Sequence, residues 1–236
     1  MEKKKTNTKL ILKGIGAFLI YFLVSQFAAF PFYLLGIDLE TVSTTIKCIY
    51  TVVIQLIIIL SIFLLFKDYI IKSFNDFKKN HKEYFKIYFK YWLVILGLMA
   101  LSNGLIMLVD SDATANNQDA VNELFKQLPV YTFILSVFLA PMVEELAFRL
   151  SFRAVFKNKY LFIFLSGIVF GSFHVIMSYE SMVDLLYIIP YSIPGWIFAY
   201  TLQKSDNIFV PMSLHFLHNG ILMSLQVFIL LFGIGA

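Results

Sequence analysis

Residues 48–66 read CIYTVVIQLIIILSIFLLF, a stretch of nineteen residues without a single charge. An α-helix needs about 20 predominantly apolar residues to cross the hydrocarbon core of a bilayer. Lipid offers no hydrogen-bond partner to the backbone, so a lone spanning segment of this length must be helical. The stretch therefore predicts a membrane-spanning helix, and it sets the fold class expected for the sequence around it.

Six further runs carry no charge or almost none, and they lie at residues 14–36, 91–109, 128–143 (continuing into Glu144), 160–179, 185–203 and 207–236. We therefore predict an all-α, polytopic membrane helix bundle of about seven transmembrane helices, forming one domain over residues 1–236. The first run is longer than the apolar region of a signal peptide, so we expect it to be retained as a span. The last run predicts either one long tilted helix or a helix interrupted near Asn219 and Gly220.

The composition supports a membrane protein. Of the 236 residues, 59% are apolar and only 14% are charged, whereas ordinary soluble domains have about 45–50% and about 25%. The mean hydropathy is +0.79. These values exclude a typical soluble enzyme and a disordered protein. The net charge of +4 comes from short lysine clusters beside apolar runs, so the expected partner is the lipid bilayer and not nucleic acid.

The distribution of basic residues predicts the orientation. With the N-terminus in the cytoplasm and seven alternating spans, all but Lys47 and Lys126 of the 19 Lys and Arg residues fall on the cytoplasmic side. Cytoplasmic loops of membrane proteins carry such an excess of Lys and Arg. We therefore predict a multi-pass protein of the plasma membrane with its N-terminus inside and its C-terminus outside.

Two connections between the apolar runs are long. Residues 67–90 mix lysines with aromatic residues at helical spacing, which indicates either an interfacial amphipathic helix on anionic headgroups or a solvated loop. Residues 110–127 are acidic. Val121, Leu124, Phe125 and Leu128 would share one face of a short helix on the outer surface, serving either as a lid over a site or as a plain connector.

Ionisable residues at membrane depth are costly, so each is a functional candidate. The first group is the string E-E-L-A-F-R at residues 144–149. On a helix, Glu145 and Arg149 lie on one face and can pair, while Glu144 points about 100° away and is left as a candidate general base. Pro141 should kink the helix and open space beside that carboxylate. The alternative is that these charges only mark the cytoplasmic end of the span.

Two further motifs lie on later spans. Phe170 and His174 form F-x-x-x-H on the fifth span, and His215 and Asn219 form H-x-x-x-N on the seventh. Each pair is spaced by one helical turn and projects from one face. His218 lies on the flank of that face, and we interpret it as structural. Counted along the helices, the polar groups reach similar depth, so we expect a hydrolytic site assembled from three helices.

In this order, the three strings resemble the motifs of the CPBP family, the CAAX proteases and bacteriocin-processing enzymes also called Abi proteins. The resemblance covers a motif core at about residues 128–219. It implies a CAAX prenyl-endopeptidase-like intramembrane peptidase that hydrolyses a membrane-associated or secreted peptide or protein precursor. Carried over by position, Glu144 and His174 would activate the water, with Glu145, Arg149 and Phe170 in support.

For His215 and Asn219 the resemblance leaves two roles open. They would either stabilise the oxyanion of the scissile carbonyl or take part in metal binding. The set Glu144, His174 and His215 would suit one zinc ion with an open fourth position, and a metal-free glutamate mechanism has also been argued for the family. The alternative function is a non-catalytic membrane interaction protein of the same fold, a bacteriocin immunity or assembly factor.

Overall fold

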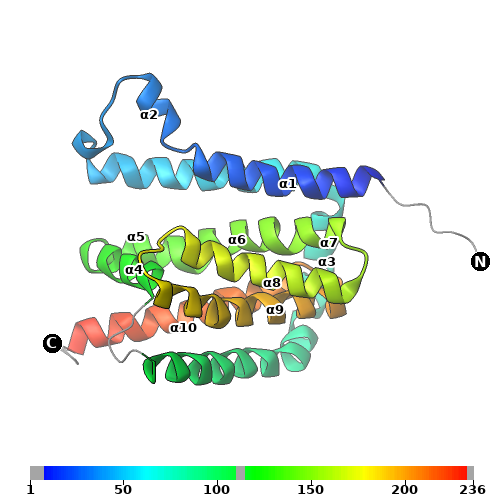
Figure 1. The fold of residues 1–236 in the computed structure, drawn as a ribbon. Coiled ribbons are helices and arrows are strands. Elements are labelled where there is room, and N and C mark those ends of the chain that lie inside the picture. The colour runs from blue at the N-terminus through cyan, green and yellow to red at the C-terminus, as the bar shows by residue number, and fades with distance from the viewer. Residues whose placement is uncertain (1–7, 110–114, 233–236) are drawn as a thin grey trace, which may run out of the picture.

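The computed structural model describes residues 8–109 and 115–232, and over these ranges the chain forms helices and no strand. The α-helices are α1 (Thr8–Gln26), α2 (Phe30–Leu34), α3 (Thr44–Met107), α4 (Asn116–Gln127), α5 (Pro129–Ile134), α6 (Ala140–Glu144), α7 (Ser151–Val155), α8 (Lys159–Ile176), α9 (Ile188–Ser205) and α10 (Phe209–Phe232). Shorter helical turns of other types are η1 (Leu39–Thr41), η2 (Leu135–Leu139), η3 (Glu145–Leu150) and η4 (Met182–Tyr187). The long helices run nearly side by side (Figure 1).

The predicted all-α membrane bundle is confirmed. Within the described ranges, five helical stretches are long and apolar enough to cross a membrane: α1, α3, residues 129–155, α8 and residues 182–205. At 1.5 Å per residue, the 64 residues of α3 would extend about 96 Å, roughly three times the hydrocarbon thickness. Figure 1 shows that α3 instead bends across one end of the bundle and returns. The two halves of α3 cover the predicted runs at residues 48–66 and 91–109, except for the last two residues of the second run, and the 24-residue α10 covers most of the last run.

The structure gives the details of the first and last runs. The first span begins earlier than residue 14 and already ends at Gln26, after which Pro31 starts the separate helix α2. Proline favours the first turn of a new helix over the interior of a continuing one. In the last run, Asn219 and Gly220 lie inside the continuous helix α10, so of the two predicted alternatives the one long helix forms over the described residues.

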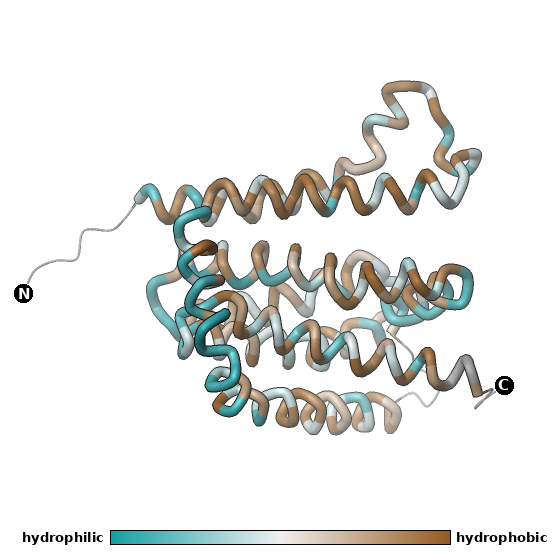
Figure 2. Tube along the Cα trace, turned by 180° about the vertical axis from the view of Figure 1, so that it is seen from behind, coloured by the Kyte–Doolittle hydropathy of each residue, from teal (hydrophilic) through white to brown (hydrophobic). Residues whose placement is uncertain are grey.

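The basic connection at residues 67–90 is helical throughout, because it forms the middle of α3. It begins at a bend, where Phe66 has the non-helical angles φ −118° and ψ 20°. At this bend the ammonium group of Lys13 donates to the carbonyl oxygen of Leu65 at 2.6 Å. Figure 2 shows that this crossing segment is hydrophilic and that the two long halves of α3 on either side of it are mostly hydrophobic. The helix is therefore established, and its contact with lipid headgroups stays a prediction.

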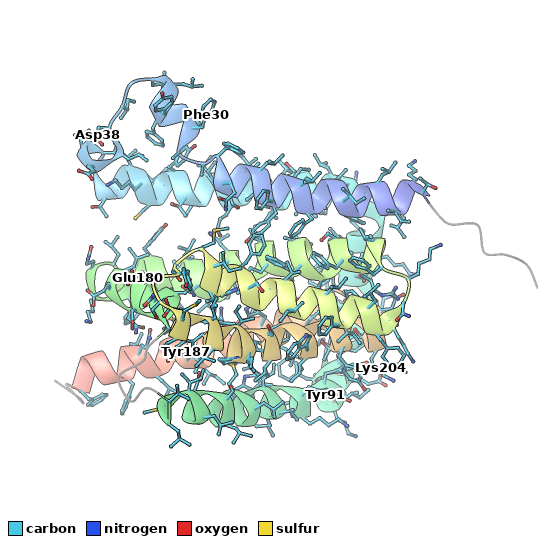
Figure 3. The ribbon with its side chains drawn as sticks, viewed as in Figure 1. Phe30, Asp38, Tyr91, Glu180, Tyr187 and Lys204 are labelled. Atoms are coloured by element: carbon cyan, nitrogen blue, oxygen red, sulfur yellow. The ribbon has the colours of Figure 1, made fainter. Side chains whose placement is uncertain are left out.

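Polar contacts define the two ends of the bundle. At one end, Arg153 and the hydroxyl of Tyr69 both reach Asp206, at 3.9 and 3.2 Å. At the other, the Asn116 amide donates to the Ser178 carbonyl at 2.9 Å. Figure 3 shows Asp38 and Glu180 at this second end and Lys204 at the first. Segments predicted to share a side of the membrane do share an end, and which end is cytoplasmic stays a prediction.

The acidic connection after α3 contains the amphipathic helix that its sequence predicts. In α4, Phe125 is buried and packs against Val137 of η2 and Met223 of α10, and Val121 is partly buried in the same cluster. The helix therefore lies across the ends of two long helices.

Glycines let α8 and α9 approach closely enough to set the site. A Cβ atom on Gly171 would collide with the hydroxyl of Ser192 and lie 2.6 Å from the carbonyl oxygen of Ile188. A Cβ on Gly195 would lie 2.8 Å from the Cα of Gly167. Small residues at such spacing allow helix backbones to touch in a membrane, and this contact fixes the position of the neighbouring Phe170 and His174.

Candidate active site

The helical stretch at residues 129–155 is not a regular α-helix around its acidic motif. The π-helical turns η2 and η3 lie on either side of α6. The N–H groups of Ala140 and Ser151 each bond a carbonyl five residues earlier. Pro141 has no N–H to donate to the preceding turn, and η2 directly precedes it. Such π-turns are rare and often mark functional sites, so the predicted kink takes the form of two widened turns that flank Glu144.

The ion pair predicted within the motif is present and fully buried. Arg149 Nε lies 3.3 Å from Glu145 Oε2, and neither side chain has any exposed surface. The guanidinium carbon lies 4.1 Å from the ring centre of Phe170 and 5.6 Å from that of Phe198. A cation over an aromatic face is attracted by the ring quadrupole. Phe170 of the F-x-x-x-H motif therefore covers the arginine of the E-E-x-x-x-R motif.

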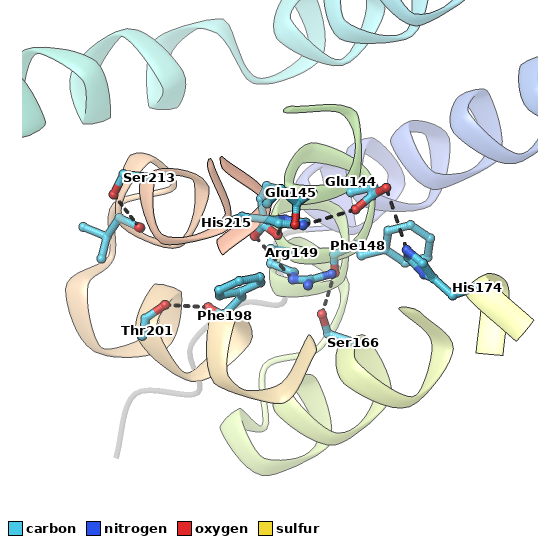
Figure 4. A network of polar contacts seen from close by, with 12 residues as sticks. Glu144, Glu145, Phe148, Arg149, Ser166, His174, Phe198, Thr201, Ser213 and His215 are labelled. Carbon is cyan, nitrogen blue, oxygen red and sulfur yellow. Dashed lines mark hydrogen bonds and ion pairs between the residues drawn. The ribbon is translucent and has the colours of Figure 1, made fainter. Parts of the chain in front are cut away.

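Glu144 lies between two histidines from different helices, as Figure 4 shows. Its carboxylate oxygens lie 4.0 Å from His174 Nε2 and 3.6 Å from His215 Nε2. About a fifth of the Glu144 and His174 side chains is exposed, whereas Glu145 is completely enclosed. The structure thus brings together three of the four predicted catalytic residues, and it distinguishes the adjacent glutamates by their accessibility.

An oxygen acceptor at Nδ1 orients the ring of each histidine. His215 Nδ1 lies 2.9 Å from Glu145 Oε1, and His174 Nδ1 lies 2.9 Å from the carbonyl oxygen of Phe170. An oxygen acceptor at Nδ1 places a proton on that nitrogen, and the Nε2 atom of each ring faces Glu144. The His174 ring is also held between Phe170 and Tyr191, with ring centres 4.4 and 4.9 Å away.

The contact between Glu145 and His215 is the functional feature that sequence reasoning missed. The sequence assigns Glu145 a partner on its own helix, Arg149, and gives no signal for a second partner 70 residues away. The pair depends on how α10 packs against η3, which no local spacing encodes.

Asn219 is placed differently from the other predicted residues. Its amide nitrogen donates to the carbonyl oxygen of Ser136 in η2 at 2.8 Å. This bond joins α10 to the widened turn that precedes Pro141. The role of Asn219 as an oxyanion donor stays a prediction. His218 is buried, and its Nδ1 has no hydrogen-bond partner among the residues that the structure describes; its structural role stays a prediction.

The donor set Glu144, His174 and His215 fits a divalent metal in its chemistry. Metal-bound histidines normally donate their second N–H to a carboxylate or a carbonyl, and both histidines do so here. Two ligands of a tetrahedral zinc lie about 3.3 Å apart, and the two Glu144–His separations are 3.6 and 4.0 Å. Over residues 8–109 and 115–232, no three His, Cys, Asp or Glu side chains are gathered tightly enough to form a metal cluster as they stand. The two separations would therefore have to shorten by about 0.3 and 0.7 Å to match a tetrahedral zinc.

The family model described as type II CAAX prenyl endopeptidase Rce1-like matches residues 126–221. The motif core is similar to this family. The matched segment contains all three motifs, so the resemblance to CPBP-type proteases that the motifs predict is confirmed over this part of the chain.

Two curated bacterial relatives match about half of the chain. The UPF0177 protein YvdC of Lactococcus lactis is 28% identical over 127 residues, which are 53% of this chain and 47% of that protein. YdiL of Bacillus subtilis, whose name describes it as a proposed membrane peptidase, is 24% identical over 116 residues, 48% of this chain and 44% of that protein. The chain spans about half the length of the curated relatives it matches. No solved structure matches it.

Proposed function

We propose that this protein is an intramembrane peptidase that hydrolyses a peptide bond of a membrane-associated or secreted peptide or protein precursor. The observation that carries the proposal is the partly accessible carboxylate of Glu144 between the Nε2 atoms of His174 and His215. A carboxylate and two imidazoles at membrane depth are costly unless they are used. The similarity to prenyl endopeptidases and to a proposed membrane peptidase supports the same chemistry.

Glu144 is the proposed general base. A water molecule between Glu144 and His174 would lose one proton to the carboxylate while its oxygen attacks the scissile carbonyl carbon. The tetrahedral intermediate then collapses, the C–N bond breaks, and Glu144 returns the proton to the leaving amine. Positioned donors lower the barrier because they stabilise the oxyanion of this intermediate.

His215 is the proposed source of that stabilisation. Its Nδ1–H is held by the Glu145 carboxylate at 2.9 Å, and a carboxylate in this position stabilises positive charge on the ring. A protonated Nε2 would donate to the oxyanion, with the amide of Asn219 as a second donor after release from Ser136. Arg149 and Phe170 act on this step only by holding Glu145 in place.

A zinc ion is part of the proposal as a cofactor to be tested. Glu144, His174 and His215 would hold it, and it would supply Lewis-acid polarisation of the water or of the carbonyl. Either version uses the same three side chains, and the Nδ1 acceptors of the two histidines keep their Nε2 atoms directed at the reacting centre.

The test uses the purified protein in liposomes and a defined library of short peptides, each made with and without a C-terminal farnesyl group. Cleavage is followed by mass spectrometry. Glu144→Gln, which is nearly isosteric, should reduce cleavage by about 10²–10⁴-fold, the usual contribution of a general base. Glu123→Gln serves as the matched control, because Glu123 is exposed on α4 and forms a surface ion pair with Lys126.

Two results would contradict the proposal. Equal cleavage by the wild type and Glu144→Gln would remove this residue from the mechanism. Absence of cleavage by the wild type in both halves of the library would favour the non-catalytic interaction protein instead.

A further inference from the structure

Glu144 forms part of the wall of a cavity of about 280 Å³ between α1, α3 and α6. This volume is near the lower end of small-molecule pockets, which start at about 300 Å³. Figure 1 shows that α1 and the first half of α3 lie along one side of the helices that carry the motifs. The motif core therefore supplies only one wall, and the residues of α1 and α3 that line the remainder belong to no motif.

Gln55 is the unusual residue in that wall. It interrupts the apolar run of α3, and its Oε1 atom is buried without a hydrogen-bond partner in the part of the chain that the structure describes. The neighbouring polar groups of the same wall are engaged. Tyr50 donates to the carbonyl of Ala28 at 2.7 Å, and Thr51 donates to its own helix at the carbonyl of Lys47 at 3.0 Å.

A buried side-chain oxygen without a partner is unfavourable at this depth unless a ligand supplies a hydrogen bond to it. A buried acceptor without a hydrogen bond destabilises a protein appreciably, and an apolar residue at position 55 would continue the run without that cost. A peptide substrate also carries unpaired polar groups when it lies in the membrane. Around the scissile bond its backbone is not helical, so its N–H and C=O groups lack partners in an apolar surrounding.

We infer that Gln55 binds the main chain of the substrate: its side-chain amide turns into the cavity that it lines, and Oε1, which is enclosed in the free protein, then accepts one backbone N–H close to the scissile bond. The inference rests on the proposed peptidase activity. A side-chain amide presents one acceptor and one donor end, which matches a peptide group without reading its side chain. Gln55 thus positions the peptide against Glu144 through the cavity they share, and it does so for substrates of different sequence.

The experiment is a double-mutant cycle between the protein and the peptide. The probe is the unfarnesylated or farnesylated library peptide that the wild type cleaves fastest, resynthesised as a series in which each amide near the scissile bond is replaced by an ester. An ester lacks the N–H. At one position it should raise KM of the wild type by about two- to tenfold, the range of a single neutral hydrogen bond, while kcat changes by less than about twofold.

Gln55→Leu should raise KM for the all-amide peptide by the same factor, and the sensitive ester should then have no further effect. Leu56→Met is the matched control, because Leu56 is the next residue on α3 and is 49% exposed on the outside of the bundle. It should respond to the ester series as the wild type does. If Gln55→Leu fails to accumulate, Gln55→Met tests the same loss with an unbranched side chain.

Stability separates a binding role from a structural one. Gln55→Leu should melt no lower than the wild type, because it removes a buried acceptor that has no partner among the described residues. An unchanged KM in Gln55→Leu, or ester effects identical in wild type and Gln55→Leu, would overturn the inference about Gln55. If cleavage in the same assay still depends on Glu144, the proposed peptidase activity is unaffected by that result. Absence of cleavage by the wild type would overturn both.

Discussion

Breaking the buried pair of Glu145 and Arg149 should have unequal consequences for the two partners. Removing one partner of a buried ion pair costs about 3–5 kcal/mol, because the other charge stays buried and uncompensated. Arg149 cannot lose its proton, and it would keep only the rings of Phe170 and Phe198 and the weaker attraction of the Glu144 carboxylate among the described residues. Glu145 would retain the imidazole of His215 at 2.9 Å. Glu145→Gln should therefore lie near the upper end of that range and Arg149→Met near the lower end.

The double variant Glu145→Gln/Arg149→Met should recover most of this loss. Replacing a buried ion pair by neutral groups of similar volume is often neutral for stability, and the side-chain carbonyl of the introduced glutamine would still accept from His215 Nδ1. If the two single effects were additive, the double variant would lose about 8 kcal/mol, more than many domains possess in total. We expect a loss of less than about 2 kcal/mol instead.

The free energy of unfolding is measured for all four proteins in mixed micelles. The matched control is the exposed pair of Glu123 and Lys126, whose side chains are about two-thirds exposed and whose equivalent cycle should yield a coupling below about 1 kcal/mol. Equal losses from the two single variants, or an additive double variant, would refute the reasoning. Peptide cleavage provides a second readout. The folded double variant should cleave about 10–100-fold more slowly, since the amide positions the imidazole of His215 without its negative charge.

Three further predictions test the cofactor, the topology and the helix packing. If zinc is the cofactor, chelator treatment should abolish cleavage and zinc should restore it, whereas full activity with far less than one metal per chain would show a metal-free mechanism. Labels at the sites predicted to be outside should be accessible from outside intact cells, and labels at the sites predicted to be inside should not; the outer sites are Glu40, Ala115 and Ala236, and the inner sites are Lys79, Lys157 and Lys204. A cytoplasmic C-terminus would contradict the seven-span count. Gly171→Leu should lower Tm and cleavage together, because its side chain would collide with Ser192 and the backbone of α9, while Leu161→Ala at an exposed position of α8 should change neither.

The sequence predicts the helical bundle well because the bilayer leaves few alternatives. An uncharged run of about 20 residues has only the helix available to it in lipid, so existence and type of the long helices follow directly. The boundaries are less secure, since they depend on local chemistry within an apolar run. Pro31 carried the signal that the first run would break before it. No glycine or proline occurs between Lys67 and Lys90, so α3 continues as a helix through the charged segment that connects two predicted spans.

The candidate site is predictable in its members and less so in their contacts. Spacing by one turn places Glu145 beside Arg149 and Phe170 beside His174, and these relations hold in the structure. Contacts between helices are different, because they depend on rotation and depth that spacing does not encode. Asn219 illustrates this, since its amide reaches the carbonyl of Ser136 across the bundle although the sequence places it one turn from His215.

The arrangement around His215 explains how two adjacent glutamates can have different roles. Its Nε2 faces Glu144 at 3.6 Å and its Nδ1 faces Glu145 at 2.9 Å, so one ring separates the two carboxylates. The buried carboxylate is neutralised by Arg149 and fixes the ring, whereas the accessible one opens to the cavity that contains Gln55. The burial of the two side chains favours this division of the proposed roles, because about a fifth of Glu144 is accessible and Glu145 is enclosed. A positional swap in which Glu145 activates the water would require η3 to turn its enclosed face outward and to expose Arg149 with it.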